Sequence, residues 1–283
     1  MNITTLLDKV YFAPRLKKID FYANRAGELQ HRVLDRLVRM AENTEWGKKY
    51  DYKSIHTYED FRNRLPIQTY EEVKPYVERL RAGEQNLLWP SEIRWFAKSS
   101  GTTNDKSKFL PVSKEALNDT HYQGGKDAVA LYLGQNPDSR FFSGQGLILG
   151  GSHSPNLNSR HGLVGDLSAI LIQNIHPLVN CVRVPSKKIA LMSDFEKKIE
   201  AIANSAVSKD VTSLSGVPSW MLVLIKRILE KTGKQSLEEI WPNLEVFFHG
   251  GVAFTPYREQ YKEVIRSPKM HYVETYTASE GYF

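Results

Sequence analysis

Hydrophobic positions in the first third of the chain recur at helical spacing. Between residues 15 and 41, apolar side chains return every three or four positions among charged ones, as on one face of an α-helix. The stretch TYEEVKPYVERL at 69–80 begins with a threonine and carries glutamates in its first turn, which is typical of a helix start. We therefore expect residues 1–85 to form a helical N-terminal segment that packs on a main domain.

Beyond residue 85, short apolar runs typical of strands alternate with helical patterns. The strand candidates are EIRWFAK (92–98), KFLPV (108–112), GLILGGS (146–152), LVNCVRVP (178–185), LEVFFHGG (244–251) and MHYVETY (270–276). The helix candidates are 114–133, which Gly124 and Gly125 interrupt, 193–207 with Ser193 or Asp194 as N-cap, 220–233, which ends at Gly233, and 255–267. This alternation predicts the α/β fold class, with largely parallel sheets flanked by helices, over residues 86–283.

Composition narrows the class of protein. Of the 283 residues, 41% are hydrophobic and 25% charged, and the net charge of +6 suits small anions without favouring nucleic acid. The most apolar run, WMLVLIKRIL at 220–229, contains two charges and is too short to span a bilayer, and the N-terminus lacks a signal-peptide pattern. The single cysteine, Cys181, lies in an apolar, strand-like context and predicts a buried thiol. We expect a cytoplasmic protein without a membrane partner; the oligomeric state stays open.

The hydroxyl-rich stretch KSSGTTNDKSK at 98–108 lies between two strand candidates. It could form a plain polar turn or a phosphate-binding loop, because Gly101 permits close backbone approach while hydroxyls and lysines can donate to phosphate oxygens. The Walker pattern is absent, since no second glycine precedes Lys106 and a strand follows instead of a helix. The stretch GQGLILG at 144–150 departs from the dinucleotide fingerprint and indicates a tight turn before a core strand.

The pattern SSGTT followed by a lysine resembles the phosphate-binding signature of acyl-adenylate-forming enzymes, in the form found in the auxin-responsive promoter family. Further blocks of that family follow in the expected order: TEWGKKY (44–50), LPIQTYEEVKPYVERL (65–80), SGVPSWM (215–221), HGGVAFTPY (249–257) and YTASEG (276–281). The resemblance covers nearly all of the chain. On these motifs the chain is identified as a member of that family of acyl-acid amido synthetases, and we expect it to be a bacterial relative.

The resemblance implies an ATP-dependent ligase that uses Mg²⁺. A small carboxylic acid attacks the α-phosphate of ATP to give an acyl-adenylate and pyrophosphate, and an amine, usually of an amino acid, then attacks the acyl carbon. Because a carboxylate must approach a polyanion, the site must neutralise charge in advance and align the attack.

The family's functional positions map onto matching residues of this chain. The phosphates would be held by Ser99, Ser100, Gly101, Thr102 and Thr103, and Lys108 closes that motif. The nucleotide would further contact Gly250, Gly251 and Val252 as the adenine shelf, Tyr276 by stacking, Thr277, and Ser279 at the α-phosphate, while Glu280 would coordinate Mg²⁺. The resemblance makes Thr102, Thr103, Lys108 and Glu280 the catalytic set and gives Val217, Trp220 and Met221 as lining of the acyl pocket. We expect the hydroxyl-rich loop and Glu280 to grip one Mg²⁺–ATP unit.

Plainer interpretations stand beside these roles. Glu280 could be a surface carboxylate, Tyr276 could belong to the core, and Trp220 and Met221 could be ordinary core residues. His249 could act as a base, although a hydrogen-bonded histidine at a strand end is favoured. His153 and His161 do not match common zinc spacings.

Family members continue well beyond the position of Phe283, so the resemblance implies an incomplete N-terminal domain with the C-terminal domain absent. We accordingly expect weak or no ligase turnover from residues 1–283 alone. Two alternatives share the nucleotide site: an acyl-CoA ligase, in which the acceptor differs, and a non-catalytic nucleotide-binding fragment.

Overall fold

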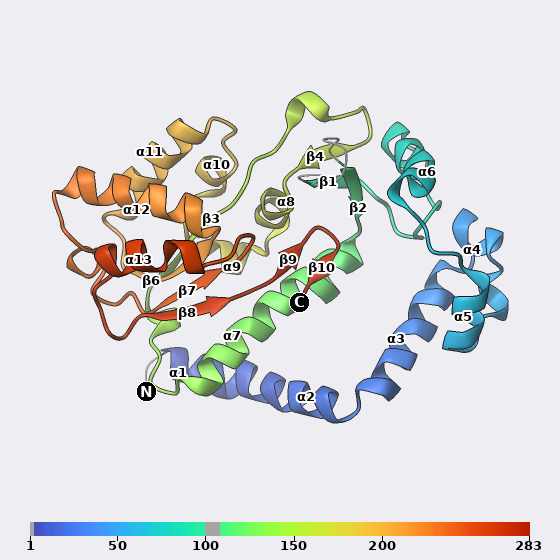
Figure 1. Ribbon diagram of the computed structural model, residues 1–283, viewed down its shortest axis with the longest axis horizontal. Helices are drawn as coiled ribbons and strands as arrows, with labels where there is room; N and C mark the ends of the chain where they lie inside the picture. The colour runs from blue at the N-terminus through green and yellow to red at the C-terminus, as the bar shows by residue number, and fades with distance from the viewer. Residues whose placement is uncertain (1–2, 100–107) are drawn as a thin grey trace. The chain divides into compact units, whose positions relative to one another are not determined.

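The computed structural model describes residues 3–99 and 108–283 (Figure 1). These residues group into two compact units. Of the described residues, one unit contains 3–16, 120–153 and 166–283, and the other contains 17–99, 108–119 and 154–165. The units divide the chain at points other than residue 85. The predicted division into a helical N-terminal segment at 1–85 and an α/β portion at 86–283 therefore stays a prediction.

A five-stranded sheet forms the centre of the first unit, which we call the sheet unit. Its strand order is β5-β3-β6-β7-β8, and every neighbouring pair is parallel. The strands are β3 (Gln145–Leu149), β5 (Arg183–Val184), β6 (Val211–Gly216), β7 (Val246–His249) and β8 (His271–Glu274). The predicted α/β class with a largely parallel sheet and a helical N-terminus is confirmed.

Helices cover both faces of this sheet. They are α1 (Ile3–Leu7), α7 (Gln123–Gln135), α8 (Leu167–Asn174), α9 (Pro177–Cys181), α10 (Lys187–Ala190), α11 (Phe195–Ala206), α12 (Pro218–Thr232) and α13 (Arg258–Val264). Successive residues of a strand point to opposite faces. Phe247 accordingly joins the larger core with α11, α12 and α13, whereas Val246 and Phe248 pack with residues of α7 such as Leu133.

A small hairpin follows the sheet. Its strands are β9 (Thr277–Ala278) and β10 (Gly281–Tyr282), which pair antiparallel. Figure 1 shows the hairpin beside α7.

The second unit combines helices with a three-stranded sheet of order β2-β1-β4. Its elements are α3 (Ala26–Ala41), α4 (Glu45–Lys49), α5 (Tyr58–Arg64), α6 (Tyr70–Ala82), β1 (Trp95–Ser99), β2 (Lys108–Val112) and β4 (Leu163–Gly165), and α2 (Ala13–Asn24) runs into it from the sheet unit. The predicted helix at 69–80 is confirmed as α6: Glu72 accepts a hydrogen bond from the Thr69 amide at 2.6 Å, and Gly83 ends the helix with φ of +109°. The core of this unit is built around Phe96, Leu80 and Val164.

Three local predictions are wrong. The run 178–185 is not one strand, because Pro177 and the imidazole of His176, which accepts from the Leu178 amide at 3.3 Å, start helix α9 and leave only the two-residue β5. Cys181 at the end of α9 is consequently exposed rather than buried. The glycines at 124 and 125 do not interrupt a helix; α7 continues through them after a π-helical segment, Ala116–Tyr122.

The helical pattern predicted at 15–41 is confirmed, as two successive helices. Arg25, with φ of −133°, separates α2 from α3. Within residues 3–99 and 108–283, none of the helices is both long enough and apolar enough to cross a membrane.

Candidate functional site

The carboxyl ends of three neighbouring strands bring the C-terminal motifs together. Strand β6 ends at Gly216, β7 at His249 and β8 at Glu274, and the parallel register places these residues on one edge of the sheet. Ligands of open parallel α/β sheets bind outside this edge. We call it the carboxyl edge; it carries the block SGVPSWM, the block HGGVAFTPY and the start of YTASEG.

Gly250 and Gly251, which continue β7, are required by packing. A Cβ on Gly250 would lie 2.1 Å from the carbonyl oxygen of Thr275, and Gly251 has φ of +85°, a conformation that strains any other residue. A Cβ on Gly251 would also approach the Val217 side chain to 3.2 Å. The two glycines therefore allow the ends of β6, β7 and β8 to meet with little side-chain bulk between them.

Thr275 is fixed to the end of β7 by its backbone and its side chain. The carbonyl oxygen of His249 accepts from the Thr275 amide at 2.7 Å and from its hydroxyl at 3.2 Å. This connection sets where the next residue, Tyr276, leaves the sheet.

Tyr276 and Glu280 are both exposed. The Tyr276 side chain is 63% exposed, which excludes the core alternative, and its ring lies 5.3 Å from that of Phe283. Ser279 and Glu280 form the turn of the β9–β10 hairpin, after Thr277 in β9. The hairpin is closed by the Phe283 amide, which donates to the Tyr276 carbonyl oxygen at 2.8 Å. The carboxylate of Glu280 is thus presented to solvent on a hydrogen-bonded turn.

His249 points away from solvent beneath the carboxyl edge. Its side chain is 3% exposed, and its ring stacks on Phe254 at 4.3 Å. The Nδ1 atom is buried without a hydrogen-bond partner among the described residues, so the expectation of a fully hydrogen-bonded histidine is wrong at this atom. Burial lowers the pKa of His249, with Glu274 opposing the shift and Arg258 adding to it.

The carboxyl end of β3 is organised by a buried lysine. Lys198 in α11 is 1% exposed, and its Nζ donates to the carbonyl oxygens of Gly150 and Gly151 at 3.1 and 2.9 Å and to the Ser152 hydroxyl at 3.0 Å. Burial lowers the pKa of Lys198, whereas the charge of Asp166 acts in the opposite direction. This ammonium group holds the loop after β3 in one conformation.

The three residues expected to line the acyl pocket have different surroundings. Val217 precedes α12 and lies at the carboxyl edge. Trp220 is 42% exposed and its ring lies 5.9 Å from that of Phe195. Met221 is fully buried in the larger core, as the plainer interpretation expected. Their contact with a substrate stays a prediction.

The hydroxyl-rich loop falls mostly on residues that the structure does not describe. Ser100, Gly101, Thr102 and Thr103 lie outside the described residues, so their meeting with Glu280 stays a prediction. The two flanking positions are placed: Ser99 pairs with Lys108 in the antiparallel β1–β2 ladder, and the Lys108 ammonium lies 5.6 Å from the ring centre of Tyr70.

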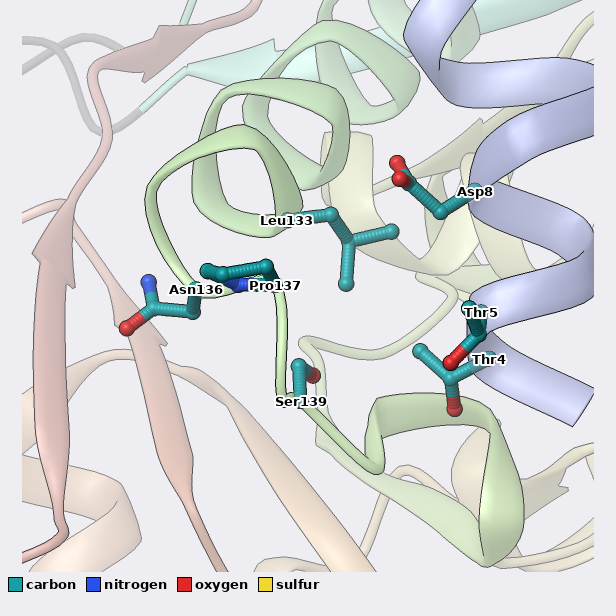
Figure 2. A pocket seen from close by; sticks show the side chains of 7 residues that line it. All are labelled: Thr4, Thr5, Asp8, Leu133, Asn136, Pro137 and Ser139. Carbon is teal, nitrogen blue, oxygen red and sulfur yellow. The ribbon is translucent and has the colours of Figure 1, made fainter. Parts of the chain in front are cut away.

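A small pocket lies elsewhere in the sheet unit, between α1 and the end of α7 (Figure 2). Its volume of about 10 Å³ admits at most one water molecule. Its lining residues are Thr4, Thr5, Asp8, Leu133, Asn136, Pro137 and Ser139. It is too small for a substrate.

The chain that follows the carboxyl edge carries one exposed carboxylate, that of Glu280, and its contact with magnesium and ATP stays a prediction. No cluster of three or more acidic, histidine or cysteine side chains suited to a metal occurs in the described part of the chain. Mg²⁺ usually takes one or two carboxylates together with substrate phosphates, and the exposed Glu280 provides one such carboxylate.

The sequence model of the GH3 family N-terminal domain matches residues 15–270 of this chain. The chain belongs to the GH3 family. The family predicted from the sequence is therefore confirmed, whereas the block YTASEG at 276–281 lies beyond the matched residues.

Individual GH3 proteins are similar over shorter stretches. Indole-3-acetic acid-amido synthetase GH3.2 of Arabidopsis thaliana is 30% identical over 103 residues, which are 36% of this chain and 19% of that protein. Jasmonoyl–L-amino acid synthetase JAR4 of Nicotiana attenuata is 26% identical over 106 residues, 37% of this chain and 18% of that protein. These aligned stretches span less than a fifth of either plant protein.

Two solved GH3 structures share the fold. The GH3.15 acyl acid amido synthetase aligns with 94% of this chain at a TM-score of 0.69, and its complex with 2,4-DB aligns with 90% at a TM-score of 0.73, both at 16% identity. The chain covers 56% and 53% of their lengths, so it spans about half of each.

The sequence of this GH3 chain did not reveal two features at the carboxyl ends of the strands, one after β3 and one after β8. Lys198 was overlooked, although it interrupts the apolar stripe of α11 between Phe195 and Ile202, where a charge signals a buried partner. The role of Thr275 has no comparable signal, because its contacts depend on the pairing of β7 with β8.

Proposed function

We propose that this chain carries the ATP-binding portion of a ligase that forms an acyl-adenylate and then an amide. The observation that carries the proposal is the carboxyl edge. In a chain of the GH3 family, Gly250 approaches Thr275 closely at the ends of β7 and β8, and Tyr276 and the Glu280 turn follow Thr275 in the chain. A glycine surface, an exposed aromatic ring and an exposed carboxylate are suited to a purine base and to a metal-bound phosphate.

The proposed first step joins a small carboxylic acid to AMP. A carboxylate oxygen forms a bond to the α-phosphorus of ATP while the bond between that phosphorus and the bridging oxygen breaks, and pyrophosphate leaves. In the second step an amine nitrogen, proposed to be that of an amino acid, bonds to the acyl carbon, AMP leaves and the nitrogen loses a proton. The relatives are longer, so this second step is proposed for the whole protein.

Each group of residues has a proposed role in these steps. The nucleotide contacts are assigned to Gly250, Gly251, Val252, Tyr276, Thr277 and Ser279, and the acyl contacts to Val217, Trp220 and Met221. Ser99, the loop at 100–103 and Lys108 are assigned to the phosphates. Bound Mg²⁺ would neutralise phosphate charge, and Glu280 would hold it. The protein's part is to align the carboxylate with the α-phosphorus and to exclude competing water.

Calorimetric titration with ATP, with and without Mg²⁺, tests the nucleotide site directly. We expect Mg²⁺-dependent binding that falls at least tenfold in Glu280→Gln and is unchanged in Glu263→Gln, a control carboxylate exposed on α13. Absence of ATP binding to the parental chain, or equal losses in both variants, would contradict the proposal.

Exchange of labelled pyrophosphate into ATP, run with a panel of carboxylic acids, tests the adenylation step. Mass spectrometry of the products with CoA and with amino acids as acceptors then separates an amido synthetase from an acyl-CoA ligase. The full-length protein is the appropriate enzyme for the second measurement.

A further inference from the structure

The β9–β10 hairpin is fixed to α7 through one aromatic ring. Gly124 lies in the first turn of α7, and a Cβ built on it would lie 2.4 Å from Cγ, 2.6 Å from Cδ1 and 2.7 Å from Cβ of Tyr282. The ring of Tyr282 therefore rests directly on the helix backbone. These contacts join residues that are far apart in the sequence but belong to the same compact unit.

Two further contacts hold the same hairpin. The hydroxyl group of Tyr282 interacts with the side chain of Thr275, and Thr275 is itself hydrogen-bonded to the end of β7. Gly281 is buried, and a Cβ there would lie 3.7 Å from the methyl carbon of Thr120. We call Gly124, Tyr282 and Thr275 the hairpin anchor.

The neighbouring glycine shows that the absence of a side chain at 124 has a specific cause. A Cβ on Gly125 would meet no atom within 4 Å. Both glycines lie in the same helix turn, where alanine is intrinsically favoured by up to about 1 kcal/mol. Only Gly124 is therefore needed for the close approach of the hairpin. Helix formation does not explain either glycine, because alanine would be favoured at both positions.

We infer that the hairpin anchor sets the position of the Ser279–Glu280 turn, which makes Gly124 and Tyr282 positioning residues for the carboxylate of Glu280. Register places Tyr282 opposite Thr277 and Gly281 opposite Ala278, so only the pair Ala278–Gly281 lies between Tyr282 and the turn. A displacement of the Tyr282 ring moves the turn with it. The inference rests on the proposed function, in which Glu280 holds the magnesium of bound ATP.

The expected consequence is a loss of magnesium-dependent nucleotide binding without a loss of the fold. Residues that orient a metal ligand typically change metal affinity by about 10- to 100-fold when substituted. Gly124→Ala displaces the ring by a clash with its near atoms, and Tyr282→Ala removes the ring without a clash. Gly125→Ala is the matched control, with the same added methyl group one residue away.

The experiment compares these three variants with the parental chain in two measurements. The half-saturating Mg²⁺ concentration for ATP binding is obtained by calorimetry, and hydrogen–deuterium exchange of the amides at 276–283 reports the order of the hairpin. We expect Gly124→Ala and Tyr282→Ala to raise the half-saturating concentration at least tenfold and to accelerate exchange, while Gly125→Ala matches the parental chain in both.

Three results would overturn the inference. The first is that Gly124→Ala and Gly125→Ala give the same values in both measurements. The second is that Tyr282→Ala accelerates exchange while its half-saturating Mg²⁺ concentration stays unchanged. The third is that Tyr282→Ala leaves exchange unchanged. Since Tyr282→Ala introduces no clash, it tests the inference even where Gly124→Ala fails to fold. Failure of the proposed function is seen separately, as a parental chain that binds no ATP in the presence of Mg²⁺.

Discussion

Replacing Gly250 by alanine should separate β7 from the residue that follows β8. The added Cβ would lie 2.1 Å from the Thr275 carbonyl oxygen, whereas real Cβ contacts essentially never fall below 3.0 Å, so one backbone segment must retreat by about 0.9 Å. Thr275 cannot retreat freely, because its amide is bound to the His249 carbonyl oxygen at 2.7 Å. The strain therefore falls on the connection that positions Tyr276.

The cost can be estimated from two contributions. Overpacking a well-packed site costs about 1–3 kcal/mol, and weakening the hydrogen bond between Thr275 and His249 costs about 1 kcal/mol. Gly250→Ala should thus lower the free energy of unfolding by about 2–4 kcal/mol. With a urea m-value of about 3 kcal/mol/M, the unfolding midpoint falls by roughly 1 M.

Urea unfolding followed by circular dichroism measures this shift, and ATP titration of the folded variant measures its effect on the site. Gly125→Ala again serves as control, because its Cβ meets nothing within 4 Å. A midpoint for Gly250→Ala equal to that of Gly125→Ala would refute the close approach of Gly250 to Thr275 on which the description of the carboxyl edge depends.

Three further predictions concern charged and titratable groups. Lys198→Met should lower the free energy of unfolding in urea by about 2–5 kcal/mol, because two carbonyl oxygens and a hydroxyl group lose their buried donor. Lys198→Arg should not restore the parental free energy of unfolding. Burial lowers the pKa of His249, so below pH 6.5 the unfolded state binds more protons than the folded state. The free energy of unfolding should therefore decrease as the pH is lowered through this range. His249→Leu should make that decrease smaller. Hydrogen bonds from Lys231 and Arg227 lower the pKa of Glu200 to about 2. The stability that this carboxylate contributes above pH 4.5 should therefore be lost as the pH falls from 4.5 towards 2. This loss should be absent in Glu200→Gln and weaker in high salt.

The sequence predicted best those helices whose ends carry capping residues, proline or glycine. Helix α6 has a capping box at its start and Gly83 at its end, and α12 begins at Pro218 and stops before Gly233, so both were expected within a few residues. The segment at 178–185 was mispredicted because its apolar pattern suits a strand, whereas the cap formed by His176 starts a helix.

Which residues of the candidate site lie near one another could be predicted only from the order and direction of the strands. Parallel strands end on one edge, so motifs that follow β7 and β8 could be expected to lie near each other. The contact between Gly124 and Tyr282 could not, because nothing in the sequence near either residue specifies which helix turn meets which ring. The burial of Lys198 likewise depends on how α11 packs on the loop after β3.

The interleaving of the two units has a consequence for synthesis on the ribosome. In the three-stranded sheet, β1 lies between β2 and β4, yet β4 begins at Leu163, about sixty residues after β1 ends at Ser99. At about 5–20 residues per second, the nascent chain leaves one side of β1 without its partner strand for about 3–13 s. During that interval the bare strand edge can pair with another polypeptide, which makes it a natural binding site for chaperones that act on emerging chains.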